Sequence, residues 1–281
     1  MEVLAEHKLF LCPEKCEFHW KQIEYLELVI SENRVKMDPV KVARVHDWPT
    51  PENQTDVQAF IGFINFYYRF VRDFSTITRP LFHLTHSNKT WNWNAKEQEA
   101  FECLKIVVTT ALVLVLPQDL EPFCIKANSS DFASGAVLSQ QLPGEEKWHP
   151  VAFYSKSLAL VEQNYEIHDK EMLTIIHALE EWRHFLEGAQ YLVEIWTDHK
   201  NLEYFMTAKK LNRRQAHWSL YLAHFDFKLI HCPGRSMGKP NMLLWRPDHG
   251  NGASDNKDVV LLRTELLAIQ ALKGVQLEGP E

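Results

Sequence analysis

The spacing of apolar residues changes along the chain, and each spacing predicts a different kind of element. Between residues 8 and 37, apolar and polar side chains alternate over short runs separated by the turn-forming stretch "SEN", which is typical of a β-hairpin. From Asp38 to about residue 108, apolar side chains instead recur every three or four positions, which predicts helices. The first part of the chain is therefore expected to be a small β unit followed by a helical unit.

The expected helices begin at residues that commonly cap helices. Asp38 is followed by Pro39, which suits an N-cap and the first helical position. Thr55 starts the capping-box pattern "TDVQ", and Asn94 stands three residues before Glu97 in the same pattern. We therefore place helix starts at these three points.

The helical unit is rich in aromatic residues, and two interpretations are open. Between its capped helices we expect a further short helix, broken by Pro80. The simpler interpretation is that the aromatic side chains form the core of the unit, and the alternative is a platform on which nucleic-acid bases stack. The residues concerned recur at helical spacing: Phe60, Phe63, Ile64, Tyr67, Tyr68 and Val71.

After residue 121 the pattern changes to strands, three in sequence and then two that alternate with helices. The order βββαβααβα predicts an α/β fold (α+β overall), with a mixed sheet and helices packed on it. The expected strands are 122–128, 134–142, 149–155, 191–198 and 225–232, and the expected helices are 163–187, 200–207, 212–222 and 238–246.

Composition and charge limit the function classes. The net charge is −7, so any contact with nucleic acid must come from local basic patches. No apolar run reaches the ~18 residues of a membrane span, so we expect no membrane partner. Five scattered cysteines favour a reduced, intracellular chain in the cytoplasm or nucleus, although Cys12 and Cys16 leave a zinc site as an alternative.

Two acidic residues fall where elements of the predicted sheet end. Asp198 ends the strand "VEIWTD", and Glu171 lies on the long helix just off its apolar stripe. Because ligands gather at the carboxyl ends of strands, these acids could hold Mg²⁺, which takes oxygen ligands. The other interpretations are that Asp198 caps the next helix and that Glu171 is solvated. Two comparable positions, Asn128 and Asn241, carry amides instead.

A basic stretch, "KKLNRRQAHW", offers a local patch for nucleic acid. Such side chains can contact phosphates, and the alternative is a solvated helix face. The residues are Lys209, Lys210, Arg213, Arg214 and His217.

These stretches, taken in order, resemble one family. "PFCIKANSSDFASGAVLSQ", "HPVAFYSKSL", "NYEIHDKEMLTIIHALEEWRHFLEG" and "IWTDHKNLEYF" resemble the ribonuclease H domain of gypsy-type LTR retrotransposon polyproteins, especially fungal ones. "MDPVKVARVHDWPTPENQTDVQAFIGFINFYYRFV" resembles the reverse transcriptase thumb of the same family. The resemblance implies an RNase H-like mixed five-stranded sheet with flanking helices, preceded by a thumb and a palm remnant.

The resemblance also implies a division of the chain. We expect a palm remnant at 1–35, a thumb-like helical unit at 36–90, a connection helix and linker at 91–120, an RNase H-like domain at 121–249 and a tether toward integrase at 250–281. The implied ancestral activity is Mg²⁺-dependent hydrolysis of the RNA strand of RNA–DNA hybrids, with RNA-directed DNA polymerase in the intact polyprotein. The implied partners are RNA–DNA hybrid or other nucleic acid and the remainder of the polyprotein.

The family site is implied to hold two Mg²⁺ ions on four acids, and this chain departs from it. Glu171 and Asp198 match two of the acids, whereas Asn128 and Asn241 stand at the other two. An amide carries no charge and presents a donor that cannot face a cation, so we expect hydrolysis to be lost or severely impaired. Asp131, three residues beyond Asn128, is not expected to replace the lost acid.

Two alternatives remain open, and one activity is not expected. The chain could be an active RNase H endonuclease with a reorganised metal site, or a non-catalytic hybrid-binding or domesticated interaction module. No Y-x-D-D motif of the polymerase occurs in the sequence, so we do not expect this chain to synthesise DNA by itself. A further departure is Glu27, where the family usually has glycine.

Overall fold

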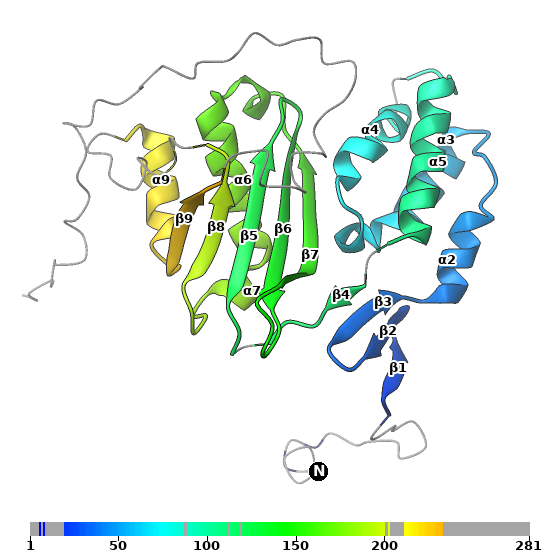
Figure 1. Cartoon of the computed structure of the whole chain (residues 1–281). Coiled ribbons are helices and arrows are strands. Elements are labelled where there is room, and N and C mark those ends of the chain that lie inside the picture. The colour runs from blue at the N-terminus through cyan, green and yellow to red at the C-terminus, as the bar shows by residue number, and fades with distance from the viewer. Residues whose placement is uncertain are drawn as a thin grey trace, which may run out of the picture.

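The computed structural model describes residues 20–232, apart from 87–88, 112, 119, 200–201 and 203–210, together with Glu6 and Lys8. These residues form a four-stranded sheet, a helical unit and a five-stranded sheet with flanking helices (Figure 1). No helix in this part of the chain is long and apolar enough to cross a membrane. Several expectations lie outside the described residues: the helices at 200–207 and 238–246, the tether at 250–281, Asn241, Lys209, Lys210 and the zinc alternative at Cys12 and Cys16.

The small sheet is antiparallel throughout, and its first strands form the predicted hairpin. Its order is β1 (Gln22–Tyr25), β2 (Leu28–Ser31), β3 (Arg34–Met37) and β4 (Leu114–Val115). Two residues, Leu26 and Glu27, make the turn between β1 and β2, and both have positive φ angles of 47° and 62°. Only glycine adopts this conformation without strain, so the residue that departs from the family pattern stands where glycine would fit best.

The helical unit contains α2 (Pro39–His46), α3 (Gln54–Asn65), the 3₁₀ turn η2 (Tyr68–Phe70), α4 (Phe74–Leu84) and α5 (Ala95–Thr109). The predicted caps of α2 and α5 are confirmed. The predicted start of α3 at Thr55 is wrong, because the Asn53 side chain accepts the backbone N–H of Asp56 at 3.0 Å and begins the helix earlier. Pro80 does not break α4, whose buried face, which includes Leu81, holds the helix together.

The aromatic residues of this unit form its core. Phe60 and Tyr67 are 0% and 1% exposed, and the Phe60 ring lies 4.5 Å from that of Phe101 on α5. Trp48 packs against Phe60 and Phe63. Bases could not stack on side chains that are buried in this way, so the interpretation as a stacking platform is wrong for Phe60 and Tyr67.

The second sheet has five strands and is mixed, as predicted. Its order is β7 (Trp148–Ser157), β6 (Ala133–Gln141), β5 (Phe123–Ser129), β8 (Val193–Thr197) and β9 (Phe227–His231). β5, β6 and β7 run antiparallel to one another, whereas β8 is parallel to both β5 and β9. The predicted helix at 163–187 is divided into η3 (Glu162–Asn164), α6 (Ile167–Glu181) and α7 (Arg183–Leu186), and α9 (Arg213–Leu222) packs against α6.

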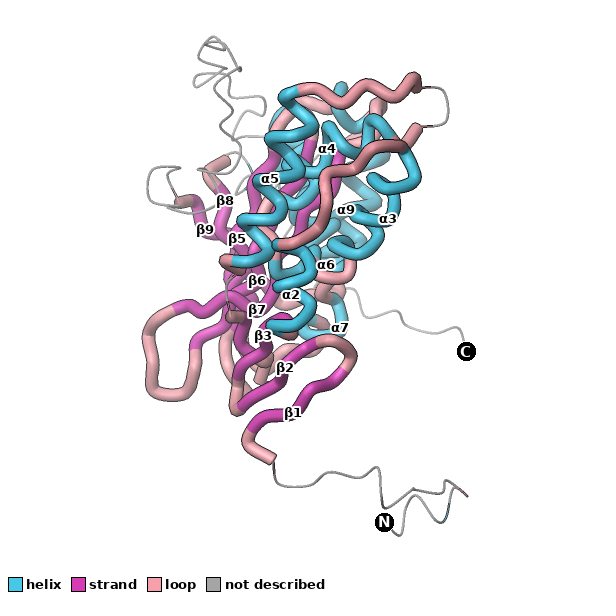
Figure 2. Tube along the Cα trace, turned by 90° about the vertical axis from the view of Figure 1, so that its right-hand side faces the viewer, coloured by secondary structure: helices cyan, strands magenta, loops and turns pink. Residues whose placement is uncertain are grey.

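The helical unit is attached to the β7 side of this sheet. In Figure 1 the two lie side by side, and Figure 2, viewed from that side, shows the helices in front of the strands. η2 and α4 pack on β7, and Phe153 of β7 belongs to the apolar core of the helical unit. The sheet is thereby held on one side by the helical unit and covered elsewhere by α6.

Candidate functional site

The candidate site lies where β5 and β8 end next to each other. These strands are parallel, with Lys126 opposite Trp196. Asn128 lies near the end of β5, and Asp198 follows directly after β8, so both residues lie at the same edge of the sheet. Because side chains alternate between the faces of a sheet, Asn128 projects from the same face as Lys126. The Lys126 Nζ lies 4.6 Å from the centre of the Trp196 ring, which agrees with a shared face.

Glu171 reaches the same sheet edge from α6. It is only 1% exposed, so the interpretation as a solvated glutamate is wrong. Its Oε1 accepts a hydrogen bond from the backbone N–H of Ser129 at 2.8 Å and another from the Ser129 hydroxyl at 2.9 Å. Ser129 therefore positions the carboxylate at the end of β5, a role that only the polar run "NSS" at the strand end could have suggested.

Glu171 and Asp198 are two acids that lie close together and receive few hydrogen bonds. Burial, with a smaller contribution from the negative charge of Asp198, raises the pKa of Glu171 to about 8, while the hydrogen bonds from Ser129 act in the opposite direction. Burial also lowers the pKa of the neighbouring His199, against the effect of Asp198. The site thus holds less charge at neutral pH than its two acids would suggest.

Two carboxylate oxygens fit a cation as partner. Glu171 Oε2 and Asp198 Oδ1 are buried and have no hydrogen-bond partner among the described residues. Buried carboxylate oxygens without donors are costly unless a positive charge satisfies them. However, in the described part of the chain no three His, Cys, Asp or Glu side chains are grouped so that they could hold a metal ion. The chain therefore provides two acids, Glu171 and Asp198, of the four that the resemblance implies.

Asp131 is committed to another partner. Its carboxylate accepts a hydrogen bond from Lys170 Nζ of α6 at 2.9 Å, and its side chain is 70% exposed whereas that of Lys170 is 7% exposed. The acid thus neutralises a buried lysine. This arrangement agrees with the expectation that Asp131 does not replace an acid at Asn128.

The basic residues of α9 divide into two groups. Arg214 forms an ion pair with the buried Asp169 of α6, and its guanidinium lies 3.7 Å from the centre of the Tyr165 ring. Arg213 and His217 are exposed and, four positions apart, share one face of the helix. Arg214 therefore serves the packing of α9, and only Arg213 and His217 of the described basic residues face outward from this helix.

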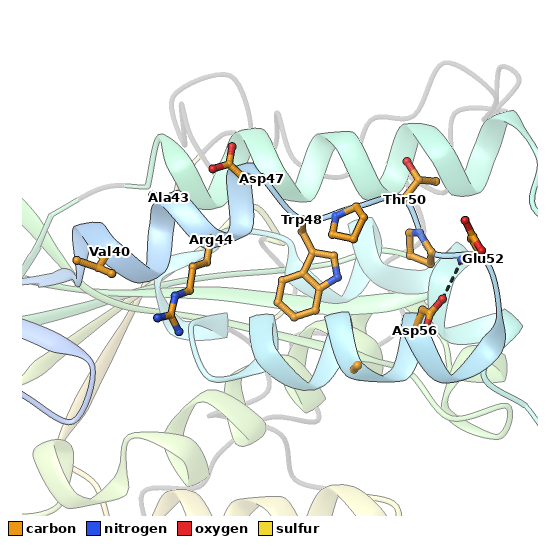
Figure 3. Close-up of a pocket in the computed structure, with 11 residues that line it drawn as sticks. Val40, Ala43, Arg44, Asp47, Trp48, Thr50, Glu52 and Asp56 are labelled. Carbon is orange, nitrogen blue, oxygen red and sulfur yellow. Dashed lines mark hydrogen bonds between the residues drawn. The ribbon is translucent and has the colours of Figure 1, made fainter.

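A separate surface groove of about 800 Å³ lies along α2 and the start of α3 (Figure 3). Trp48 forms part of its wall, and none of its lining residues belongs to the site at Asn128. Asp56, at one end, accepts the backbone N–H of Glu52 at 3.0 Å and so takes part in the start of α3. We assign the groove no chemistry.

Comparison with known proteins identifies the sheet that carries the site. Residues 119–225 match the family described as the RNase H-like domain found in reverse transcriptase. This segment belongs to that family. The match covers four of the five strands, β5 to β8, but not β9, and it includes Glu171 and Asp198.

The chain around the RNase H-like domain is also related to known proteins. Over 236 residues, or 83% of its length, it is 33% identical to the Transposon Tf2-3 polyprotein of Schizosaccharomyces pombe, and equally to the Tf2-4 polyprotein. The chain spans only 18% of these polyproteins. The predicted relationship to a fungal-type LTR retrotransposon polyprotein is confirmed.

Solved structures show the same fold. A foamy viral protease-reverse transcriptase in complex with double-stranded DNA superimposes with a TM-score of 0.63 over 75% of this chain and 38% of its own, at 19% identity. A foamy viral protease-reverse transcriptase in complex with an RNA/DNA hybrid gives a TM-score of 0.62 over 85% of this chain and 31% of its own, also at 19% identity. These similarities confirm the predicted RNase H-like mixed sheet with flanking helices.

Proposed function

We propose that this chain is part of a retrotransposon polyprotein whose RNase H-like domain binds RNA–DNA hybrids but hydrolyses the RNA strand very slowly or not at all. The observation that carries the proposal is Asn128, a buried amide near the end of β5, at the same edge of the sheet as Asp198. Support for the nucleic-acid partner comes from the relatives, one of which has been solved with an RNA/DNA hybrid.

The reasoning on hydrolysis is electrostatic. Glu171 and Asp198 would hold a Mg²⁺ ion through the two oxygens that lack donors. When bound, such an ion lowers the pKa of water and stabilises charge on the phosphate. Two carboxylates offset one divalent cation, not two. Asn128 adds an NH₂ donor and no charge, so the strand end that should contribute most to the site weakens it.

Binding of the hybrid does not depend on the missing acids. Arg213 and His217 face outward from α9 and can contact phosphates without any change in the packing of the helix. Replacing both by alanine is expected to weaken binding of a labelled RNA–DNA hybrid and to reduce its salt dependence by about one phosphate contact. Lys147→Ala, at an exposed turn of the same domain, is the matched control.

The test of hydrolysis uses a labelled RNA–DNA hybrid with Mg²⁺. We expect no cleavage by the chain as it stands and partial recovery in Asn128→Asp/Asn241→Asp, because the double change restores the family's four acids. Adding Glu171→Gln to the double variant should abolish the recovered cleavage, which excludes a contaminating nuclease. Robust cleavage by the unmodified chain that Glu171→Gln removes would refute the proposal and favour a reorganised active site. Absence of hybrid binding would refute the binding function.

A further inference from the structure

Helix α4 is capped by a residue from the other structural unit. Its own N-cap residue, Asp73, makes no capping hydrogen bond, although aspartate is among the best N-caps. The backbone N–H of Ser75, which an N-cap side chain would ordinarily receive, donates instead to the hydroxyl of Ser155 on β7 at 3.1 Å. The first turn of α4 is therefore completed across the interface between the helical unit and the RNase H-like domain.

Asp73 has been turned away from its helix and onto the sheet. Its φ of 55° is left-handed, a conformation that aspartate tolerates better than most residues but at some cost. The carboxylate lies over Gly135 of β6, where a Cβ on that glycine would be 3.8 Å from Asp73 Oδ1. Gly135 pairs with Asn128, so Asp73 sits on the sheet one strand away from the candidate site.

The surroundings of this carboxylate disfavour its charge. Burial raises the pKa of Asp73 to about 7, although Arg72 acts in the opposite direction. Arg72 is itself desolvated, and its Nε and Nη2 are buried without hydrogen-bond partners among the described residues. Gly135, over which Asp73 Oδ1 lies, carries no charge, and neither does Ser155, which accepts the Ser75 amide.

We propose that Asp73 and Ser155 exchange the capping of α4 and so form a proton-linked latch between the helical unit and the RNase H-like domain. In the docked arrangement, Ser155 caps the helix and neutral Asp73 lies over Gly135. In the released arrangement, ionised Asp73 returns to an extended backbone conformation and caps its own helix, where the positive end of the helix favours its charge. The latch is thus held by a proton and opened by its loss.

The direction of the pH effect follows from the linkage. Asp73 has a raised pKa in the docked chain and an ordinary pKa, about 3.9, when exposed. Docking therefore takes up a proton between these values, and its equilibrium constant falls by up to about tenfold for each pH unit as the pH rises through this window. Above about pH 7 both arrangements carry the ionised acid and the effect levels off.

Asp73→Asn separates charge from geometry, because asparagine also accepts left-handed angles and also caps helices. Chemical unfolding of the full chain is measured at pH 5.5 and pH 8.0 for the unmodified chain, Asp73→Asn and the control Glu99→Gln, an exposed acid on α5. We expect the unfolding constant of the unmodified chain, relative to Asp73→Asn, to rise by about thirtyfold between the two pH values. Glu99→Gln should show no such change. A ratio that is the same at both pH values would overturn the proposal.

A second variant tests the exchange of caps. Ser155→Ala should raise the hydrogen-exchange rate of the Ser75 amide, after correction for intrinsic rates, by about twofold to thirtyfold, the range expected for loss of an N-cap. This increase should be clear at pH 5.5 and smaller at pH 8.0, because ionised Asp73 can then cap the helix itself. Unchanged protection of Ser75 in Ser155→Ala at pH 5.5 would show that β7 does not cap α4, and the latch would then be wrong.

Discussion

Replacing Glu171 by glutamine is expected to stabilise the chain at alkaline pH and to change it little near pH 5 when divalent cations are absent. Glutamine keeps an oxygen that can accept the two hydrogen bonds from Ser129, but it never carries charge. In the folded chain the pKa of Glu171 is raised to about 8 from 4.5, so folding retains a proton that the unfolded chain releases. Burial of the carboxyl group therefore destabilises the folded chain little below pH 4.5 and progressively more as the pH rises to 8.

The size of this effect follows from the shift. When folding retains one proton, the free energy of unfolding falls by about 1.4 kcal/mol for each unit by which the pH rises. Between pH 5 and pH 8 the unmodified chain should therefore lose up to about 4 kcal/mol relative to Glu171→Gln. The side chain is 1% exposed, so screening by solvent reduces this figure little.

The assay is urea unfolding followed by tryptophan fluorescence, with a chelator, at several pH values. Glu99→Gln is the control, because this acid is exposed on α5, away from the site. A stability difference between the unmodified chain and Glu171→Gln that stays constant from pH 5 to pH 8 would refute the reasoning. Added Mg²⁺ should then stabilise the unmodified chain in a saturable way at pH 8, and Glu171→Gln should lose most of that gain.

Two further predictions concern stability away from the site. Leu26→Asn should raise the free energy of unfolding by about 1 kcal/mol, because asparagine accepts the positive φ of this hairpin turn and Leu26 is 66% exposed; an unchanged urea midpoint would contradict this. Arg214→Met should cost about 2 kcal/mol, a value discounted for the 36% exposure of the guanidinium, because it leaves the carboxylate of Asp169 buried without its cation. Arg213→Met, on the exposed face of the same helix, should change stability by less than about 0.5 kcal/mol, and equal losses in the two variants would contradict the assignment.

The parts of the fold that depend on local periodicity could be predicted from the sequence. The five strands and α6 follow from alternation and from one apolar stripe, so the edge that carries Glu171 and Asp198 could be located as well. The helix starts at Asp38 and Asn94 were also predictable, because a cap acts within four residues. The predicted start at Thr55 was wrong because Asn53, two positions earlier, accepts the backbone N–H of Asp56 and begins the helix there.

Contacts between distant segments could not be predicted in this way. Arg214 was predicted to contact phosphate together with Arg213, because the sequence does not show that it pairs with the buried Asp169, 45 residues earlier. Ser155 likewise gives no sign in its own strand that it completes a helix 80 residues away. The direction of the Asp73 carboxylate could not be predicted, because it depends on a left-handed backbone conformation that is decided by packing between two units.

The acids of the site affect the stability of the folded chain as well as its chemistry. A carboxylate at position 128 would lie at the same edge of the sheet as Asp198 and near Glu171, whose pKa is already raised by burial and by its neighbour. Without a bound cation, each additional acid at this edge raises the cost of folding, because like charges would be held together with few donors. An amide at position 128 removes that cost and keeps the shape of the side chain. Loss of the acid should therefore stabilise the fold while it weakens hydrolysis of the RNA strand. This is the direction expected when selection no longer maintains the hydrolytic activity.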